Sequence, residues 1–177
     1  MSTFPAELTG TWVIDESHST VGFAVKHAVV ATTRGKFTSY SGGATIDAAN
    51  PESSSLWVEI DASSVDTGSE QRDGHLKSPD FFDVEKFPQI TFKSSNFAFD
   101  GDNVKSATGE LTMNGITRPV TLTANVFKCA PHPVTKKMQC GADFVTTVKR
   151  SDFGMKYALG PLADEVTLRI SVESMKD

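Results

Sequence analysis

The first residues that could do chemistry form a short polar segment near the N-terminus. There Asp15, His18 and Ser19 bring an acid, an imidazole and a hydroxyl close together in the chain. An acid that orients an imidazole, which in turn activates a hydroxyl, is the arrangement of a nucleophilic enzyme site. A turn before a strand favours the same short polar side chains, because they bond to its own backbone. We interpret this segment as such a turn.

A second cluster, Arg72, Asp73 and His75, permits three interpretations that the residues alone do not separate. It could be an acid–base set, a group of donors for the polar head of a ligand, or an ion network that fixes a helix to the fold. Farther along, we expect Arg150 and Asp152 to form a structural ion pair. Nowhere in the sequence do a nucleophile and a base have the spacing of a known catalytic motif, so we expect no catalytic residues.

The cysteines and histidines do not form a recognisable metal site. The histidines are scattered along the chain, without the spacing of a metal-binding motif: His18, His27, His75 and His132. Cys129, His132 and Cys140 are only a partial ligand set. We instead expect the two cysteines to face each other across a hairpin and to remain thiols in a reducing compartment.

Composition excludes several classes of function. The net charge is −5 and lysine and arginine never occur in runs longer than a pair, which argues against nucleic-acid binding. No apolar stretch approaches the roughly 20 residues of a spanning helix, so we expect no stable membrane insertion. The first ten residues lack the pattern of a secretory signal, and we expect a cytoplasmic location.

Apolar and polar residues alternate with a period of two over several segments, which predicts strands with one buried face. The clearest are residues 20–27, 56–60, 120–126 and 166–173. Asn114-Gly115 is typical of a tight hairpin turn between two of them. Many short strands joined by such turns indicate an all-β sandwich or barrel. Twelve of the sixteen aromatic residues are Phe, which suits a dry interior because Phe has no polar atom to satisfy.

Residues 69–86 break this alternation. Arg72 and Leu76 lie one helical turn apart, and the segment that starts at Ser78 resembles a second helix start, with Pro in its first turn. We therefore expect two short helices across one end of the barrel. Nothing in the chain resembles a linker or repeat, so we predict a single domain over residues 1–177.

Several blocks of sequence, in order, resemble those of one known family. They are residues 15–19, 23–27, 35–37, 72–83, 87–92, 109–120 and 150–155. The chain is similar to the YceI-like family of lipocalin-like polyisoprenoid-binding proteins. The resemblance implies an antiparallel lipocalin-like barrel that holds a long amphiphilic lipid, such as a prenyl quinone or polyprenyl phosphate. It implies no catalytic residue and no cofactor. Many relatives are exported to the periplasm.

On this basis we expect a lipid tunnel with a polar mouth. Glycines and alanines at inward positions could outline a narrow tunnel: Gly35, Gly109, Ala124 and Ala142. The expected tunnel residues are Phe23, Val25, Phe37, Leu76, Phe81, Phe82, Phe92, Leu111, Phe144 and Phe153. The expected head-group ligands are His27, Arg34, Arg72, His75 and Arg150.

Two other functions remain open at this point. One is a filled barrel that acts as a stress-related interaction module without a lipid. The other is a hydrolase-type enzyme on a small apolar substrate, for which the sequence shows no paired nucleophile and base. A homodimer is compatible with each of the three functions.

Overall fold

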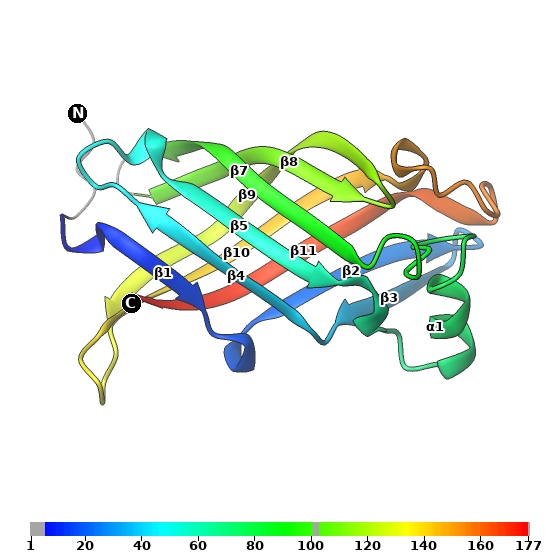
Figure 1. Ribbon diagram of the computed structural model, residues 1–177, viewed down its shortest axis with the longest axis horizontal. Coiled ribbons are helices and arrows are strands. Elements are labelled where there is room, and N and C mark those ends of the chain that lie inside the picture. The colour runs from blue at the N-terminus through cyan, green and yellow to red at the C-terminus, as the bar shows by residue number, and fades with distance from the viewer. Residues whose placement is uncertain (1–5, 101–102, 177) are drawn as a thin grey trace.

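The computed structural model describes residues 6–100 and 103–176. These residues form eleven antiparallel strands (Figure 1). One α-helix is present in these residues, α1 (Glu70–Leu76). The strands are β1 (Gly10–Ile14), β2 (Thr20–His27), β3 (Ala31–Phe37), β4 (Tyr40–Ile46), β5 (Ser55–Asp61), β6 (Val65–Asp66), β7 (Gln89–Asp100), β8 (Asn103–Met113), β9 (Ile116–Pro131), β10 (Met138–Lys149) and β11 (Leu162–Lys176). Short 3-10 turns occur at Ala6–Leu8, Glu16–His18, Pro51–Ser53, Ala62–Ser64 and Arg150–Phe153.

Eight of the strands close into a barrel. Their order is β1-β4-β5-β7-β8-β9-β10-β11, and the ring closes because β1 pairs with β11 as well as with β4. One edge of β11 pairs with β10. Along its other edge, the first part of β11 pairs with β2 and its last residues pair with β1. Strands β2, β3 and β6 therefore extend the wall at one end. The expected antiparallel lipocalin-like barrel is confirmed.

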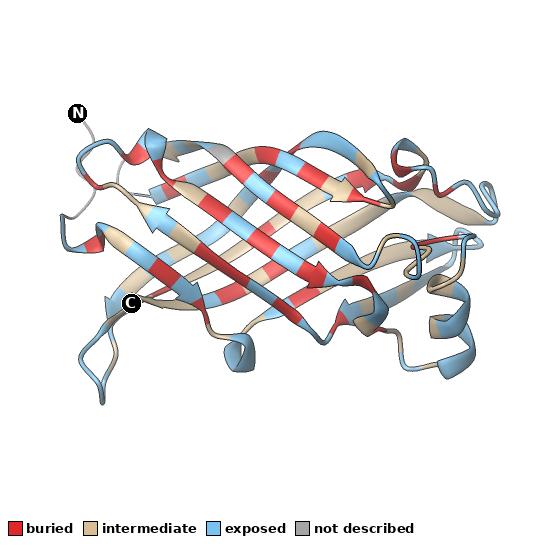
Figure 2. Ribbon diagram, viewed as in Figure 1, coloured by how far each residue is buried: buried red, intermediate tan, exposed pale blue. Residues whose placement is uncertain are grey.

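Figure 2 shows buried and exposed residues alternating along several strands, and the buried residues are mostly apolar. In β5 the buried residues Leu56, Val58 and Ile60 alternate with the exposed residues Trp57 and Glu59. Because strand side chains alternate between two faces, this single pattern both builds the wall and lines its interior.

The hairpin between β8 and β9 has the expected turn. Asn114 and Gly115 both adopt left-handed backbone angles, with φ of 54° and 75°. A Cβ atom on Gly115 would also lie 2.5 Å from the ring of Phe87. The turn thus needs Gly both for its conformation and for the close approach of that ring.

The expectation of two helices is half right. Ser69 caps α1, because its Oγ accepts a hydrogen bond from the backbone N–H of Arg72 at 3.3 Å. The second helix does not form, and residues 78–87 are turns and irregular structure. The hydroxyl of Ser78 bonds back to the carbonyl of His75 at 2.6 Å, and Phe82 N–H bonds to the carbonyl of Leu76 at 2.9 Å. These contacts fold the chain back over α1.

The turn segment after α1 carries Phe81 and Phe82, both buried, to the end of the barrel where α1 lies. The hairpin between β9 and β10 projects at the other end (Figure 1). Over the described residues, no helix has the length and apolar character needed to cross a bilayer.

Candidate binding cavity

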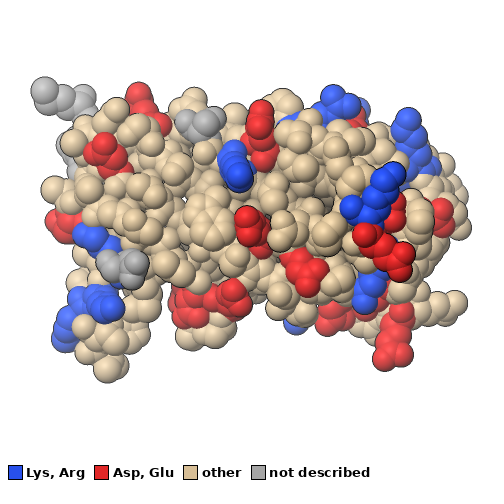
Figure 3. Space-filling view, viewed as in Figure 1, with Lys and Arg blue, Asp and Glu red and all other residues tan. Residues whose placement is uncertain are grey.

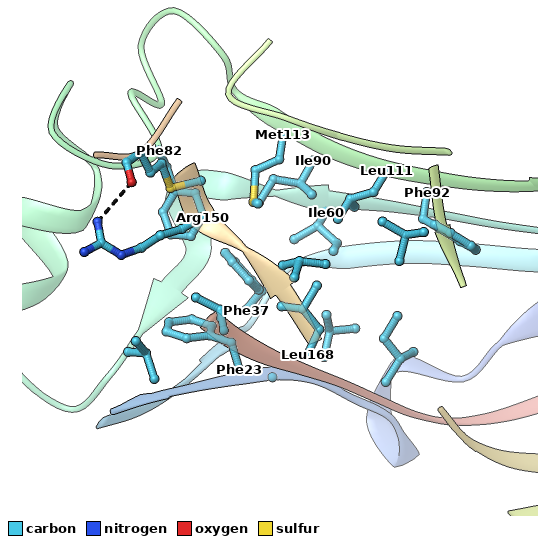
Figure 4. Close-up of a pocket in the computed structure, with 18 of the residues that line it drawn as sticks. Phe23, Phe37, Ile60, Phe82, Ile90, Phe92, Leu111, Met113, Arg150 and Leu168 are labelled. Atoms are coloured by element: carbon cyan, nitrogen blue, oxygen red, sulfur yellow. Dashed lines mark hydrogen bonds between the residues drawn. The ribbon is translucent and has the colours of Figure 1, made fainter. Parts of the chain in front are cut away.

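The barrel end beside α1 encloses an apolar cavity, which we call the near chamber. Its empty volume is about 1000 Å³, including its open side. Side chains from many strands point into it, and Figure 4 shows Phe23, Phe37, Ile60, Phe82, Ile90, Phe92, Leu111, Met113 and Leu168 around it. This space is many times larger than the volume of one water molecule. The near chamber therefore has room for part of an apolar ligand.

Three phenylalanine rings pack together in the near chamber. The ring centroids of Phe23 and Phe37 are 5.7 Å apart, and those of Phe37 and Phe82 are 5.6 Å apart. A Cβ atom on Gly35 would lie 2.4 Å from the Phe23 ring, so this glycine makes room for a ring and does not widen the tunnel. Gly109 is likewise filled by its neighbours, because a Cβ there would lie 2.2 Å from the carbonyl oxygen of Lys93.

Arg150 lies at the edge of the near chamber and is 3% exposed. Its guanidinium donates to the backbone carbonyls of Ala163, Met155, Tyr157 and Leu162 at 2.7–3.0 Å. Burial lowers its pKa, although the nearby carboxylate of Asp164 opposes the shift. Figure 4 shows the guanidinium turned away from the apolar interior.

These bonds use four of the five N–H groups of the Arg150 guanidinium. Arg150 therefore fixes the loop between β10 and β11, and the expected ion pair with Asp152 does not form. The expected role of Arg150 as a head-group ligand does not fit this geometry.

A second, more polar space adjoins the near chamber, and we call it the mouth pocket. Its empty volume is about 790 Å³, and its lining includes His27 from β2 and Arg72 and His75 from α1. The mouth pocket and the near chamber share five lining residues: Phe23, Val25, Leu76, Phe81 and Leu162. The two spaces therefore adjoin each other, and three of the five expected head-group residues line the mouth pocket.

The Arg72 cluster is partly a structural network. Arg72 donates to the side-chain oxygen of Thr67 at 2.7 Å and to its carbonyl at 2.9 Å. Asp73 accepts from the Thr67 hydroxyl at 2.6 Å, so Thr67 links both residues to the strand end before α1. His75 bonds to Asp80 at 2.8 Å and packs edge-on against Phe81 and Tyr157. The remaining N–H groups of Arg72 are available to a ligand.

Three of the expected site residues lie elsewhere. Arg34 is exposed, because the inward positions of β3 are Thr33, Gly35 and Phe37 and those between them face outward. Phe153 is 1% exposed and lines neither the near chamber nor the mouth pocket. Its carbonyl accepts a hydrogen bond from the side chain of Asn114 at 2.9 Å, so it stabilises the turn beside the barrel. Phe144 lines a different cavity, described next.

The other half of the barrel holds a separate cavity, which we call the far chamber. Its empty volume is about 590 Å³, and its lining is almost wholly apolar, including Trp12, Phe97, Val104, Ala142 and Phe144. It shares no lining residue with the near chamber. This cavity was not predicted from the sequence, although Cys140, Ala142 and Phe144 alternate along β10 and all line it.

Six tightly packed side chains separate the two chambers, and we call them the central belt. Each comes from a different strand: Trp12, Val58, Phe92, Ala107, Leu122 and Phe144. Their exposures lie between 0% and 4%, whereas inward residues nearer the mouth, such as Phe23 and Leu168, are only partly buried. The belt marks the border of the two cavities, because Val58, Phe92 and Leu122 line the near chamber and Trp12 and Phe144 line the far chamber.

The far end also carries a disulfide. Cys129 and Cys140 occupy directly paired positions on β9 and β10, and their sulfurs are bonded at 2.04 Å. The expectation that they face each other is confirmed, whereas the expectation of free thiols is wrong. Because both sulfurs are bonded to each other, neither is available to the partial metal set with His132.

The N-terminal polar segment is a turn, as expected. Asp15 accepts hydrogen bonds from the backbone and hydroxyl of Ser17 and from the ring of His18. The bonds from Ser17, and then that from His18, lower the pKa of Asp15 to about 2. Ser19 donates to the carbonyl of Asp15 at 2.6 Å. The acid, imidazole and hydroxyl therefore serve the turn between β1 and β2.

Fold and cavity together define a lipocalin-like barrel protein with an internal binding space. The family model of the YceI-like domain matches residues 12–174, and the chain belongs to this family. It is 39% identical over 159 residues to Protein YceI of Escherichia coli O157:H7, covering 90% of this chain and 82% of that protein. A UPF0312 protein of Pseudomonas aeruginosa is 38% identical over the same shares.

Solved structures agree with this assignment. Burkholderia cenocepacia BcnA superposes with a TM-score of 0.78 at 29% identity, covering 90% of this chain and 98% of that one. A YceI protein of Campylobacter jejuni gives a TM-score of 0.76 at 29% identity, covering 86% and 90%. A domain from Saccharophagus degradans, described as polyisoprenoid-binding, has a TM-score of 0.71, covering 94% and 98%, and at 15% identity shows the shared fold alone.

Proposed function

We propose that this protein binds a long amphiphilic lipid, a polyisoprenoid such as a prenyl quinone or polyprenyl phosphate, and stores or carries it. The observation that supports this most strongly is that the apolar near chamber adjoins the mouth pocket, whose lining includes His27, Arg72 and His75. An apolar tail would fill the chamber while a polar head stays at the opening. The description of the S. degradans domain as polyisoprenoid-binding agrees with this ligand class.

The tail alone would give little selectivity. At about 0.8 kcal/mol per buried CH₂, a tail of about forty carbons would gain roughly 30 kcal/mol on leaving water. That exceeds the ceiling of about 18–21 kcal/mol for non-covalent binding. Such a lipid comes from a membrane, where its tail is already buried, so most of this gain cancels. Selectivity then rests on chamber length, packing and the head group.

The mouth pocket contains donors suited to both candidate heads. Two of the five N–H groups of Arg72 bond to Thr67, and the others can hold a phosphate oxygen. His27 or His75 can donate to a quinone carbonyl.

We also propose that the protein is not an enzyme, because Arg150 is the one ionisable side chain among the described residues that line the near chamber, and it is held by backbone carbonyls.

The location and the oligomeric state stay predictions. Because disulfides are rare in the cytoplasm, the redox state of Cys129 and Cys140 in intact cells tests the cytoplasmic location expected from the sequence. A homodimer remains compatible with the outer wall of the barrel.

Native mass spectrometry of the freshly purified protein, followed by solvent extraction, tests the proposed function. We expect a discrete added mass whose extract is a prenyl quinone or prenyl phosphate. A ligand-free mass that persists after addition of both lipids would contradict lipid binding and would favour a filled interaction module. The tightly packed central belt is the feature of this barrel that agrees with a filled interaction module.

A further inference from the structure

Two loops project beyond the mouth pocket and lie side by side, and we call them the mouth rim. They are the turn between β2 and β3, residues 28–30, and the segment before β11, residues 157–160. The backbone N–H of Ala28 donates to the carbonyl of Pro161 at 2.7 Å, and His27 pairs with Leu162. Figure 1 shows both loops together at the end where α1 lies. The rim therefore forms one edge of the opening.

The mouth rim exposes apolar side chains to an unusual degree. Val29 is 85% exposed and Val30 is 91% exposed, while Tyr157 and Leu159 are 48% and 43% exposed. These four are half of the eight large hydrophobic residues that are exposed in the part of the chain that the structure describes. Apolar side chains gathered at one place on a soluble protein mark a surface that contacts a partner or a lipid.

The turn chemistry at the rim does not explain these valines. Ala28 and Val29 have left-handed backbone angles, with φ of 52° and 66°, which a tight hairpin normally gives to Asn and Gly. A β-branched residue in this region is unfavourable. The hairpin at Asn114-Gly115 uses the favoured residues for the same geometry. Neither burial nor backbone preference therefore explains why a valine occupies position 29.

Exposed cations lie beside the mouth rim although the whole protein has a net charge of −5. They are Lys26, Arg34 and Lys156, whereas Lys36 lies farther along β3, where it pairs with Asp66. The acids Asp164 and Glu165 follow in β11, where residues 162–166 pair with residues 25–27. The side of the opening formed by α1 mixes signs, with Glu70, Lys77 and Asp80. Figure 3 likewise shows acids and bases interspersed on the face that it presents. The rim side of the mouth thus combines exposed apolar residues with the neighbouring cations Lys26, Arg34 and Lys156.

We propose that the mouth rim docks reversibly on an anionic lipid bilayer. Val29, Val30 and Leu159 enter the boundary between head groups and acyl chains, and the surrounding lysine and arginine side chains contact lipid phosphates. Each cation near such a surface raises affinity roughly fivefold. This orientation places the mouth pocket against the membrane, so an apolar tail can enter the near chamber without crossing water; that last step rests on the proposed function, whereas docking itself does not.

Sedimentation with vesicles that contain no isoprenoid tests the docking. Vesicles of equal parts phosphatidylcholine and phosphatidylglycerol should bind the protein, and vesicles of phosphatidylcholine alone should bind it much less. The double variant Val29→Gly, Val30→Ser should lower the partition coefficient roughly tenfold or more, because two exposed valines are lost. Gly suits the left-handed angle of position 29, so the variant should fold at least as well as the wild type.

Val134→Ser is the matched control. Val134 is 81% exposed at the tip of the β9–β10 hairpin, at the opposite end, where Lys136 and Lys137 also lie. Its loss should leave vesicle binding unchanged. Wild-type protein that fails to sediment with the anionic vesicles, or a loss of binding with Val134→Ser and not with the rim variant, would overturn the proposal. Uptake of a prenyl quinone from detergent micelles by the rim variant, measured in parallel, reports on the proposed function independently.

Discussion

The two ends of the barrel use the same strands and differ in what surrounds their cavities. The near chamber opens into a pocket with an arginine and two histidines, and a loop with two phenylalanines covers it. The far chamber has no basic side chain in its described lining and is bordered by a disulfide and by Trp12, whose indole N–H is bonded to the carbonyl of Leu8 at 2.9 Å. Both ends can hold apolar groups, but only one can recognise a polar head.

Under the proposed function, this difference would orient a bound lipid. The head would remain at the mouth pocket and the tail would extend toward the central belt. The belt then sets how far the tail reaches, and the far chamber beyond it would be used only if the belt side chains move. Four predictions separate the roles of the two ends.

Filling the near chamber should have the largest effect. Leu111 is 6% exposed and lines the near chamber, and Leu111→Trp adds a ring to the space that the tail needs. Uptake of a prenyl quinone should be abolished while the far-ultraviolet circular dichroism is kept, although overpacking should cost about 1–3 kcal/mol of stability. Phe92→Trp should act likewise. Phe97→Trp in the far chamber is the control, and equal uptake losses at both ends would show that the near chamber is not the preferred site.

Opening the central belt should change the preferred tail length. Phe144→Ala removes a buried ring between the chambers and should cost about 3–5 kcal/mol in the free energy of unfolding, measured by denaturant titration. Competition between prenyl quinones of different length should then favour longer tails than in the wild type. Phe153→Ala loses an equally buried ring away from both chambers and should cost similar stability without changing the length preference. An unchanged preference in Phe144→Ala would mean that the belt does not limit the tail.

Removing the disulfide should affect the far end alone. The bond closes a loop with a sequence separation of 11, and the chain-entropy model gives it about 3 kcal/mol of stability. Paired Cys129→Ser and Cys140→Ser substitutions should lower the melting temperature and leave the affinity for a short-tailed quinone unchanged. A large loss of affinity would show that the two ends are coupled.

Removing Arg72 should have the smallest of these effects and should depend on the head group. Arg72→Ala should weaken binding of a polyprenyl phosphate by about 1.5–3 kcal/mol, the value of a hydrogen bond to a charged group, and should weaken a hydrocarbon of equal length much less. Calorimetric titration from micelles can measure both. Arg34→Ala, on the outer face of β3, should leave both affinities unchanged. Equal losses for the two ligands with Arg72→Ala would assign Arg72 a purely structural role.

Local sequence predicts much of the wall of this barrel. The alternation in residues 20–27 places Val21, Phe23 and Val25 inward, and Asn114-Gly115 forms the expected hairpin. These features could be predicted because each depends on a few neighbouring residues. Burial then follows from the pleat, since one inward residue fixes the faces of the whole strand.

The remaining site features depend on distant contacts that local patterns do not contain. Arg34 is on the outer face of β3, between the inward positions Thr33 and Gly35, and is not among the residues that line the mouth pocket. Arg150 was given a carboxylate partner although the folded loop supplies four carbonyls instead. The second helix failed because Ser78 bonds back to α1. The division of the interior by a belt from six strands depends on how the whole ring is staggered.

A crystal structure of the protein loaded with a prenyl quinone tests the central claim most directly. We predict that the tail lies between Phe23, Phe92 and Leu168 and ends at the central belt. The quinone ring should occupy the mouth pocket, within hydrogen-bonding distance of Arg72, His27 or His75. A quinone ring in the far chamber beside the disulfide, or a near chamber without ligand in a protein that carries the lipid elsewhere, would contradict it.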